Sequence, residues 1–235
     1  MSIKIDLKIF LFLFLFLLTS QLEIYLLLMV LAILHELGHL IAGILLKFEP
    51  EEIKLTPVGL QISFKVNYQD YSEQAKALTI KKAIIALAGP LTNLGMSTAT
   101  ILFAVIAPGF ANTYWFSLLL YSNLLIALFN LLPIYPLDGG RFLKEILKLG
   151  IGKKKANKIT YLVSKTMLVI ITAISSIVIL YLQNIAILII IAYLWYLEIL
   201  EIRKYNRRKN IEKLIQSVEK KEHSSVSCNK QRSVK

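Results

Sequence analysis

The chain has 235 residues, of which 56% are hydrophobic, and its formal net charge is +12. Its mean hydropathy of +0.63 excludes a water-soluble globular domain, and the same composition excludes disordered, fibrous and disulfide-built chains. The single cysteine, Cys228, cannot form an internal disulfide, so redox chemistry is not expected.

Apolar segments that are long enough, or nearly so, to cross a bilayer as helices follow one another along the chain. The first has no polar stretch with a small-residue cleavage site after it, so we expect a retained helix and not a signal peptide. The expected fold class is an all-α polytopic membrane protein with about six transmembrane helices. The segments comprise residues 7–20, 24–46, 83–107, 113–135, 160–182 and 185–201.

Only one set of the connections between these segments contains lysine or arginine. They occur at the N-terminus, in residues 47–82 and 141–158, and from Arg203 onward, whereas the other three connections contain none. Under the positive-inside rule, both termini and the two longer loops are cytoplasmic. Topology and contact with lipid headgroups therefore explain the basic charge, and nucleic-acid binding is not predicted.

The second apolar segment contains the sequence His35-Glu36-Leu37-Gly38-His39. Ionisable side chains in a membrane-length helix are costly and mark function by default. Two histidines four residues apart lie on one face of a helix, roughly 6 Å apart along its axis. This is the spacing of a zinc-ligand pair, with the glutamate placed to act as general base. The motif predicts a metallopeptidase that works within the membrane.

The loop of residues 47–82 carries a strand pattern. Apolar and polar residues alternate over residues 60–68. Residues 53–56 are expected to pair with them, with a turn at residues 57–59, which makes a small cytoplasmic β-hairpin. This hairpin either caps the helices or offers an edge strand that holds an unwound substrate by strand addition.

A stretch of small residues, Ala88-Gly89-Pro90-Leu91-Thr92-Asn93, lies at the start of the third segment. Gly89 and Asn93 have the spacing of a helix-packing interface. In the alternative interpretation, Asn93, or Asn130 in the fourth segment, donates hydrogen bonds to a substrate carbonyl or to a carboxylate that supports the metal site.

A third zinc ligand is needed if a water is to occupy the fourth position. Asp138 is the candidate, because Pro133 and Pro136 break the fourth segment just before it and broken backbone at membrane depth is tolerated where it lines a polar cavity. A plain helix stop is the alternative. The second and fourth segments run in the same direction, so Asp138 and the two histidines reach a similar depth. This agreement favours the ligand role.

In combination, these motifs resemble those of the site-2 protease family of intramembrane zinc metalloproteases. They are His-Glu-x-x-His, Ala-Gly-Pro-x-x-Asn and Asn-x-x-Pro-x-x-Pro-x-Asp-Gly, and they cover residues 31–141. The resemblance implies a Zn²⁺ cofactor held by His35, His39 and Asp138, with Glu36 as the catalytic base. Substrate contacts or support of the metal ligands are then expected of Asn93, Asn130 and Pro136.

The six-span plan, with no domain inserted in residues 47–82, resembles the sporulation branch of this family. The resemblance implies a bacterial cell membrane, and for this branch the mother-cell membrane around the forespore. The implied partners are a membrane-tethered pro-sigma factor as substrate, a membrane regulatory protein and the lipid bilayer. The PDZ domain of the envelope-stress branch and the CBS domain of some sporulation members are not found in the sequence, which argues against that branch and against nucleotide regulation.

We expect a membrane protease domain over residues 1–202 and a basic cytoplasmic tail over residues 203–235. Two other function classes stay open. A membrane transporter of metal or other ions could use histidine and aspartate within its spans, although the internal repeats common in transporters are not visible. A catalytically silent membrane scaffold is the other, although such relatives typically have a degraded ligand set and this chain does not.

Overall fold

The computed structural model describes residues 2–5, 10, 14, 17, 22–56, 59–64 and 75–182, and short helical stretches between 192 and 211. The chain divides into two compact units, Met1–Met167 and Leu168–Lys235. The predicted spans 7–20 and 185–201 lie largely outside the described residues and stay predictions. The boundary expected between residues 202 and 203 also stays a prediction.

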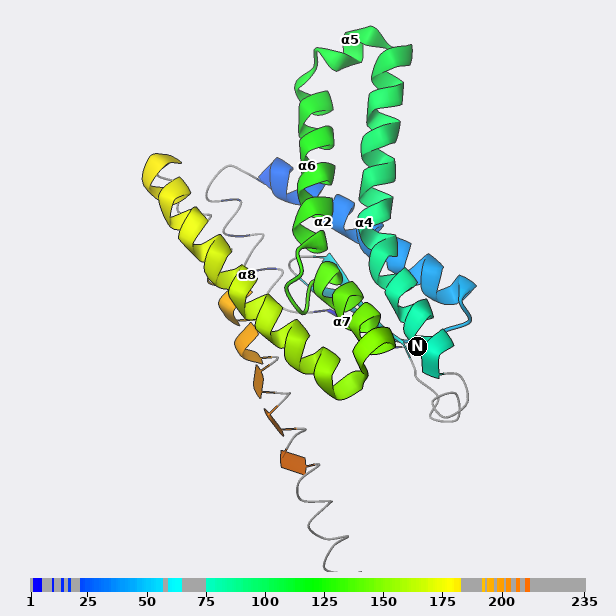
Figure 1. Ribbon diagram of the computed structural model, residues 1–235. Coiled ribbons are helices and arrows are strands. Elements are labelled where there is room, and N and C mark those ends of the chain that lie inside the picture. The colour runs from blue at the N-terminus through cyan, green and yellow to red at the C-terminus, as the bar shows by residue number, and fades with distance from the viewer. Residues whose placement is uncertain are drawn as a thin grey trace, which may run out of the picture. The chain divides into compact units, whose positions relative to one another are not determined.

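Four described helices are long and apolar enough to cross a membrane, and they correspond to the four inner predicted segments. α2 and α4 are separated by residues 46–74, whereas α4 and α6 are joined by a short connection. α6 is capped by Thr113, whose Oγ1 accepts a hydrogen bond from the Phe116 N–H at 3.3 Å. Figure 1 shows α4 and α6 next to each other, linked by α5. The helices are α2 (Leu22–Leu45), α4 (Ala75–Ile106), α5 (Pro108–Ala111), α6 (Tyr114–Leu131), α7 (Asp138–Ile151) and α8 (Lys153–Leu182), the last running from the first unit into the second.

The first unit is organised around α4, which packs against α2, α6 and α7. Its polarity is the reverse of that of a water-soluble protein. Small and polar side chains are buried between the helices, whereas large apolar side chains such as Val105, Ile106 and Leu125 are exposed. Exposed apolar surface on membrane-length helices is the surface that lipid covers, since lipid tails are themselves apolar. The predicted fold class of a helical membrane protein is confirmed.

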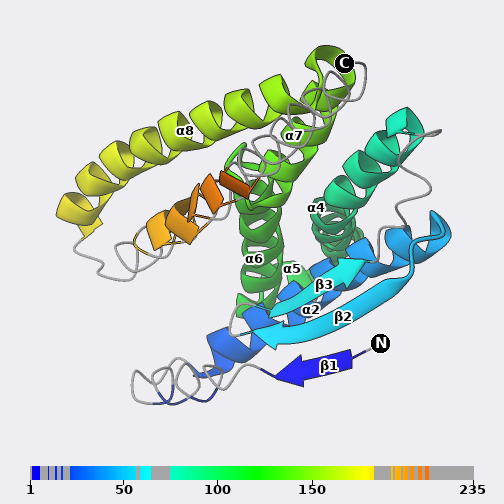
Figure 2. The same ribbon diagram turned by 90° about the horizontal axis from the view of Figure 1, so that it is seen from below.

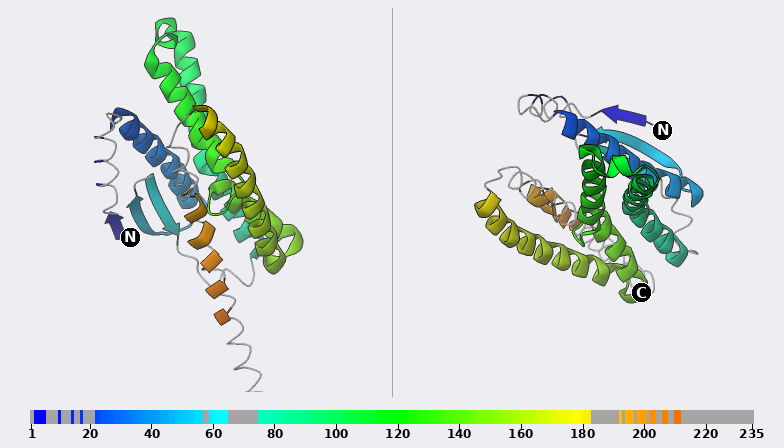
Figure 3. Two further views of the ribbon diagram at one scale, coloured as in Figure 1. Left: turned by 90° about the vertical axis from the view of Figure 1, so that its left-hand side faces the viewer. Right: turned by 90° about the horizontal axis from the view of Figure 1, so that it is seen from above.

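The predicted hairpin is present and begins three residues earlier than expected. β2 (Pro50–Thr56) pairs antiparallel with β3 (Gly59–Phe64), with Ile53 opposite Ile62. Residues 57–58 and 65–68 of the predicted turn and strand lie outside the described residues. The sheet rests on α2, as Figures 2 and 3 show.

A third strand, β1 (Ser2–Ile5), was not predicted. It pairs in parallel with β2, with Ser2 opposite Glu52, and gives the order β1-β2-β3. Parallel strands need a long crossover connection, and here the connection includes α2. Four residues carry too little pattern to indicate a strand, and only their pairing with a distant segment makes them one.

Candidate metal centre

The two histidines of the His-Glu-x-x-His motif lie buried on one face of α2. Their side chains point toward α4, and His35 and His39 are only 3% and 4% exposed. The two Nε2 atoms are 3.3 Å apart, and the rings meet edge to face at 83°. The spacing of four residues places the side chains one above the other on the helix, as the sequence predicts.

Asp138, the first residue of α7, lies next to the two histidines. Its Oδ2 is 2.9 Å from Nε2 of His35 and 3.0 Å from Nε2 of His39, and the residue is 5% exposed. The structure therefore brings together all three predicted ligands, from positions 103 and 99 residues apart.

Local sequence explains why α7 begins where it does. The link after α6 contains two prolines, which have no N–H to continue a helix. The two glycines that follow Asp138 pack tightly under this link: a Cβ on Gly139 would lie 2.6 Å from the Leu132 carbonyl oxygen, and one on Gly140 would lie 2.6 Å from that of Ile134. Glycine at both positions lets α7 approach closely enough to carry Asp138 to the histidines.

The second ring nitrogen of each histidine is held by an acceptor. His39 Nδ1 lies 2.6 Å from the carbonyl oxygen of Ile85, which only accepts, so Nδ1 carries the proton. His35 Nδ1 lies 2.5 Å from Oδ1 of Asn93, whose amide nitrogen is engaged elsewhere. Both rings therefore carry the proton on Nδ1 and present the Nε2 lone pair to Asp138, which is the form that binds a metal.

The three side chains fit a tetrahedral metal ion. Their ligand atoms lie within 4.8 Å of one another, with the closest approaches between 2.9 and 3.3 Å. Zinc bonds of about 2.0–2.1 Å at tetrahedral angles place ligand atoms about 3.3 Å apart. Two imidazoles and a carboxylate are also donors that zinc prefers, and they leave a position open.

Asp138 also lies close to a positively charged side chain. Nη1 of Arg141, whose side chain is 44% exposed, lies 3.6 Å from the Oδ1 atom of Asp138. This positive charge favours the ionised form of the carboxyl, which is the form that binds a metal.

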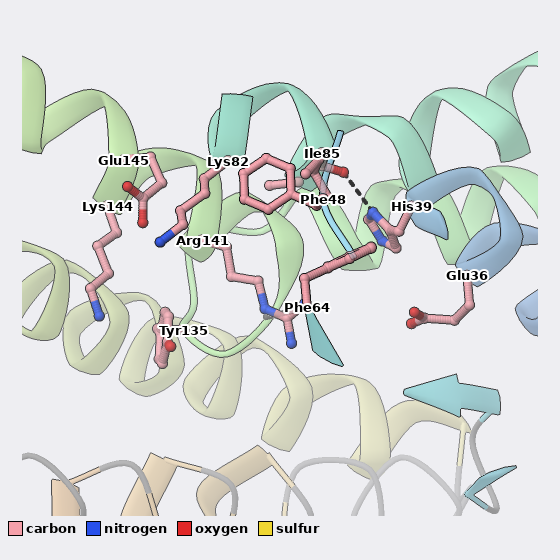
Figure 4. A pocket seen from close by; sticks show the side chains of 11 residues that line it. Glu36, His39, Phe48, Phe64, Lys82, Ile85, Tyr135, Arg141, Lys144 and Glu145 are labelled. Atoms are coloured by element: carbon pink, nitrogen blue, oxygen red, sulfur yellow. Dashed lines mark hydrogen bonds between the residues drawn. The ribbon is translucent and has the colours of Figure 1, made fainter. Parts of the chain in front are cut away.

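Glu36 lies beside the three predicted ligands and lines a cavity of about 390 Å³. The cavity is lined at one end by Glu36 and His39 and farther along by basic side chains, as Figure 4 shows. Phe64, the last residue of β3, also lines it. The remaining lining residues are Phe48, Lys82, Ile85, Ala86, Tyr135, Arg141, Lys144 and Glu145.

The other predicted site residues lie in different places. Oδ1 of Asn93 accepts a hydrogen bond from His35, whereas the sequence suggested that Asn93 donates to a substrate carbonyl or to a carboxylate that supports the metal site. Asn130 donates from Nδ2 to the carbonyl oxygen of Ile126 in its own helix, 3.0 Å away, and no hydrogen bond described here joins it to the cluster. Pro136 is half-buried in the link two residues before Asp138. Roles for these three residues stay predictions.

Three contributors were missed by sequence reasoning. The Ile85 carbonyl is a backbone group and leaves no trace in a motif. Asn123, 1% exposed in α6, receives a hydrogen bond from Asn93 at 3.0 Å, and its signal was a polar amide within an apolar span. Gly89 was assigned to helix packing, but its open side faces the rings: a Cβ there would lie 2.6 Å from His35 Nε2 and closer still to His39 Nε2.

Comparison with known proteins agrees with this centre. Residues 104–174 match the family model described as Peptidase family M50. The chain is 32% identical over 151 residues to zinc metalloprotease MJ0392 of Methanocaldococcus jannaschii, which covers 63% of this chain and 41% of that protein. It is 26% identical over 141 residues to stage IV sporulation protein FB of Bacillus subtilis, covering 60% of this chain and 46% of that one. The chain thus spans less than half the length of these two curated relatives.

The fold is similar to a solved structure, described as a site-2 protease from Methanocaldococcus jannaschii. The TM-score is 0.60 with 25% sequence identity, and the match covers 83% of this chain and 88% of that chain. The sequence matches and the fold thus point to the same family as the motifs do. Over part of its length the chain is similar to peptidase family M50, and its fold is similar to that of a site-2 protease.

Proposed function

We propose that this chain is a zinc-dependent intramembrane endopeptidase that cleaves a membrane-associated protein near the cytoplasmic face. The observation that carries the proposal is the convergence of two histidines of α2 with an aspartate of α7, with Glu36 beside them at a cavity. Similarity to relatives named zinc metalloproteases supports the metal and the reaction class.

Zinc would be held by His35, His39 and Asp138, which present two neutral imidazole nitrogens and a carboxylate oxygen. The ion, when bound, lowers the pKa of a water ligand and polarises the scissile carbonyl. The chain prepares the donors in advance, since Ile85 and Asn93 orient the two rings before any metal arrives. Ligand orientation of this kind is typically needed for tight binding.

Glu36 would act as the general base. One of its carboxylate oxygens accepts a proton from the attacking water, and Glu36 then passes that proton to the leaving amine. It lies next to His35 in the motif and lines the same cavity as His39, where a peptide could reach it. Its half-buried position shields the transfer from bulk water while the cavity leaves access for substrate.

The substrate segment must unwind before cleavage, because helical peptide bonds are shielded by their own hydrogen bonds. We place its recognition at β3, which has a strand neighbour on one side only within the described part of the sheet. The free edge offers main-chain hydrogen bonds to an extended peptide. Since Phe64 at the end of β3 lines the cavity, a peptide added there would lead toward Glu36.

The cellular setting follows from charge and similarity. The basic connections support a multi-pass protein with both termini in the cytoplasm. The similarity to a Bacillus subtilis protein supports a bacterial cell membrane. The similarity to stage IV sporulation protein FB supports a role in sporulation, with the mother-cell membrane as location and a membrane-tethered pro-sigma factor as the candidate substrate.

The test is to co-express the chain with a membrane-tethered pro-sigma factor and to immunoblot for the shortened cytoplasmic product. Wild type should yield the product and Glu36→Gln should not, because the amide has the shape of the carboxylate but does not accept a proton. The matched control is Glu23→Gln, an exposed glutamate in the first turn of the same helix, which should cleave like wild type.

Zinc content of the purified variants separates the base from the ligands. Glu36→Gln should keep its zinc, since Glu36 is not among the three converging donors. Cleavage by Glu36→Gln would refute the mechanism. Metal flux in vesicles without cleavage would establish the transporter alternative. Zinc binding without metal flux, and without cleavage of any tethered substrate, would establish the scaffold alternative.

A further inference from the structure

A buried line of amide side chains connects α6 to the metal centre through α4. Nδ1 of His35 lies 2.5 Å from Oδ1 of Asn93, and Nδ2 of Asn93 donates to Oδ1 of Asn123 at 3.0 Å. Nδ2 of Asn123 donates in turn to the carbonyl oxygen of Leu119 at 2.9 Å. Asn93 is 0% exposed and Asn123 is 1% exposed, so water does not compete for these bonds.

The direction of every bond in this line is determined. The carbonyl oxygen of Leu119 can only accept, so it faces the amide nitrogen of Asn123 and turns Oδ1 of Asn123 toward Asn93. That oxygen needs a donor, so it holds the amide nitrogen of Asn93 and turns Oδ1 of Asn93 toward His35. The Nδ1 atom of His35 must then carry the proton, and its Nε2 lone pair faces the Oδ2 atom of Asp138.

A helix-packing role accounts for only part of this arrangement. Amides between membrane helices hold the helices together through a shared hydrogen bond. An Asn93–Asn123 pair would do so whichever way its oxygens pointed. The observed orientation makes a further difference, because a flipped Asn93 would present a donor to His35 and favour the ring form with its proton on Nε2.

We propose that Asn123 is a positioning residue of the metal centre. It acts through Asn93 to hold His35 in the zinc-binding tautomer and orientation. The inference rests on the proposed zinc site and extends that site to a fourth helix, α6, which contributes none of the three ligands. Loss of the Asn123 amide frees Asn93 to turn, and His35 then loses the partner that fixes its proton.

The test measures zinc affinity of the purified full chain by competition with a chromogenic chelator. Removal of a group that orients a metal ligand typically weakens metal binding 10–100-fold. We expect a loss in this range for Asn93→Ala and about tenfold for Asn123→Ala. The double variant should bind like Asn93→Ala alone, since both changes break one line. Ser122→Ala, which removes a buried hydroxyl from the adjacent position of α6, should change the affinity less than about twofold.

Two further measurements separate positioning from folding. The absorption bands of the cobalt-substituted protein should shift in Asn123→Ala, because the ligand field at His35 changes. Asn123→Leu fills the same space without an amide and should show the same loss of affinity at a thermal midpoint close to that of wild type in the metal-free state.

Each contrary result is distinct. Wild-type protein that binds no zinc would overturn the proposed function itself. Tight zinc binding by wild type together with unchanged affinity and unchanged cobalt bands in Asn123→Ala would overturn the positioning role alone. Additive losses in the double variant would also overturn it, because the two asparagines would then act separately.

Discussion

Gly89→Ala tests whether the close approach of α4 to the histidine rings is needed for metal binding. The added Cβ would lie 2.6 Å from Nε2 of His35, about 0.8 Å inside the 3.4 Å at which ordinary contacts begin, and it would lie even closer to Nε2 of His39. The backbone of α4 cannot retreat easily, because α4 also packs on α6 and α7. The rings must therefore move, by several times the roughly 0.2 Å that metal–ligand distances tolerate.

The expected loss is large. Four-ligand zinc sites bind with about 10–16 kcal/mol, which is roughly 3 kcal/mol for each ligand. Displacing one histidine of this centre should therefore weaken zinc binding at least about 100-fold, since 1.4 kcal/mol is a factor of ten. Chelator competition on the purified protein measures the loss, and proteolysis should fall with it.

The same helix offers a matched control for this substitution. A Cβ at Gly95 meets no atom within 4 Å, so Gly95→Ala should leave the zinc affinity unchanged and should raise helix stability by up to about 1 kcal/mol. Both changes are glycine to alanine within α4, and they differ in what the new methyl group meets. A zinc affinity for Gly89→Ala within about twofold of the Gly95→Ala value would refute the steric account.

Three other substitutions test the third zinc ligand and the close contacts of α7 and α2. Asp138→Ala should lose most of the bound zinc and all cleavage; full zinc occupancy in the purified variant would reject Asp138 as a ligand. Gly140→Ala should lower both zinc content and thermal midpoint, because its Cβ would strike the backbone of the link before Asp138, whereas Gly150→Ala in the same helix meets open space and should behave like wild type. Gly38→Ala should lower the thermal midpoint by several degrees, since its Cβ would lie 2.9 Å from the Ala88 carbonyl oxygen and closer to Thr92; an unchanged midpoint would show that α2 and α4 can separate without cost.

Much of the centre could be predicted because its signals are local. Two histidines four residues apart share a helix face whatever the rest of the chain does. Their cost in an apolar span indicates function without any knowledge of neighbours. Asp138 could be proposed because prolines and glycines mark the broken backbone around it, and its place at the end of a span matched the depth of the histidines.

The supporting residues could not be assigned in the same way. Asn93 and Asn123 look like ordinary polar residues in apolar helices until the packing of three helices places them in line with His35. Gly89 has the spacing of a packing residue, and only the structure shows that its neighbours are the two rings. The partner of His39 is a backbone carbonyl, which every residue has.

The sequence by itself determined the membrane class, the four inner helices, the hairpin and the common helix face of His35 and His39, because length, apolar content and helical period are properties of short segments. Tertiary structure alone decided the pairing of β1 with β2, the meeting of Asp138 with the histidines and the buried line from Asn123 to His35. These depend on contacts between residues far apart in the chain. The geometry of the metal centre and of the buried line is set by how closely the helices pack, and that closeness depends on the small side chains at each contact.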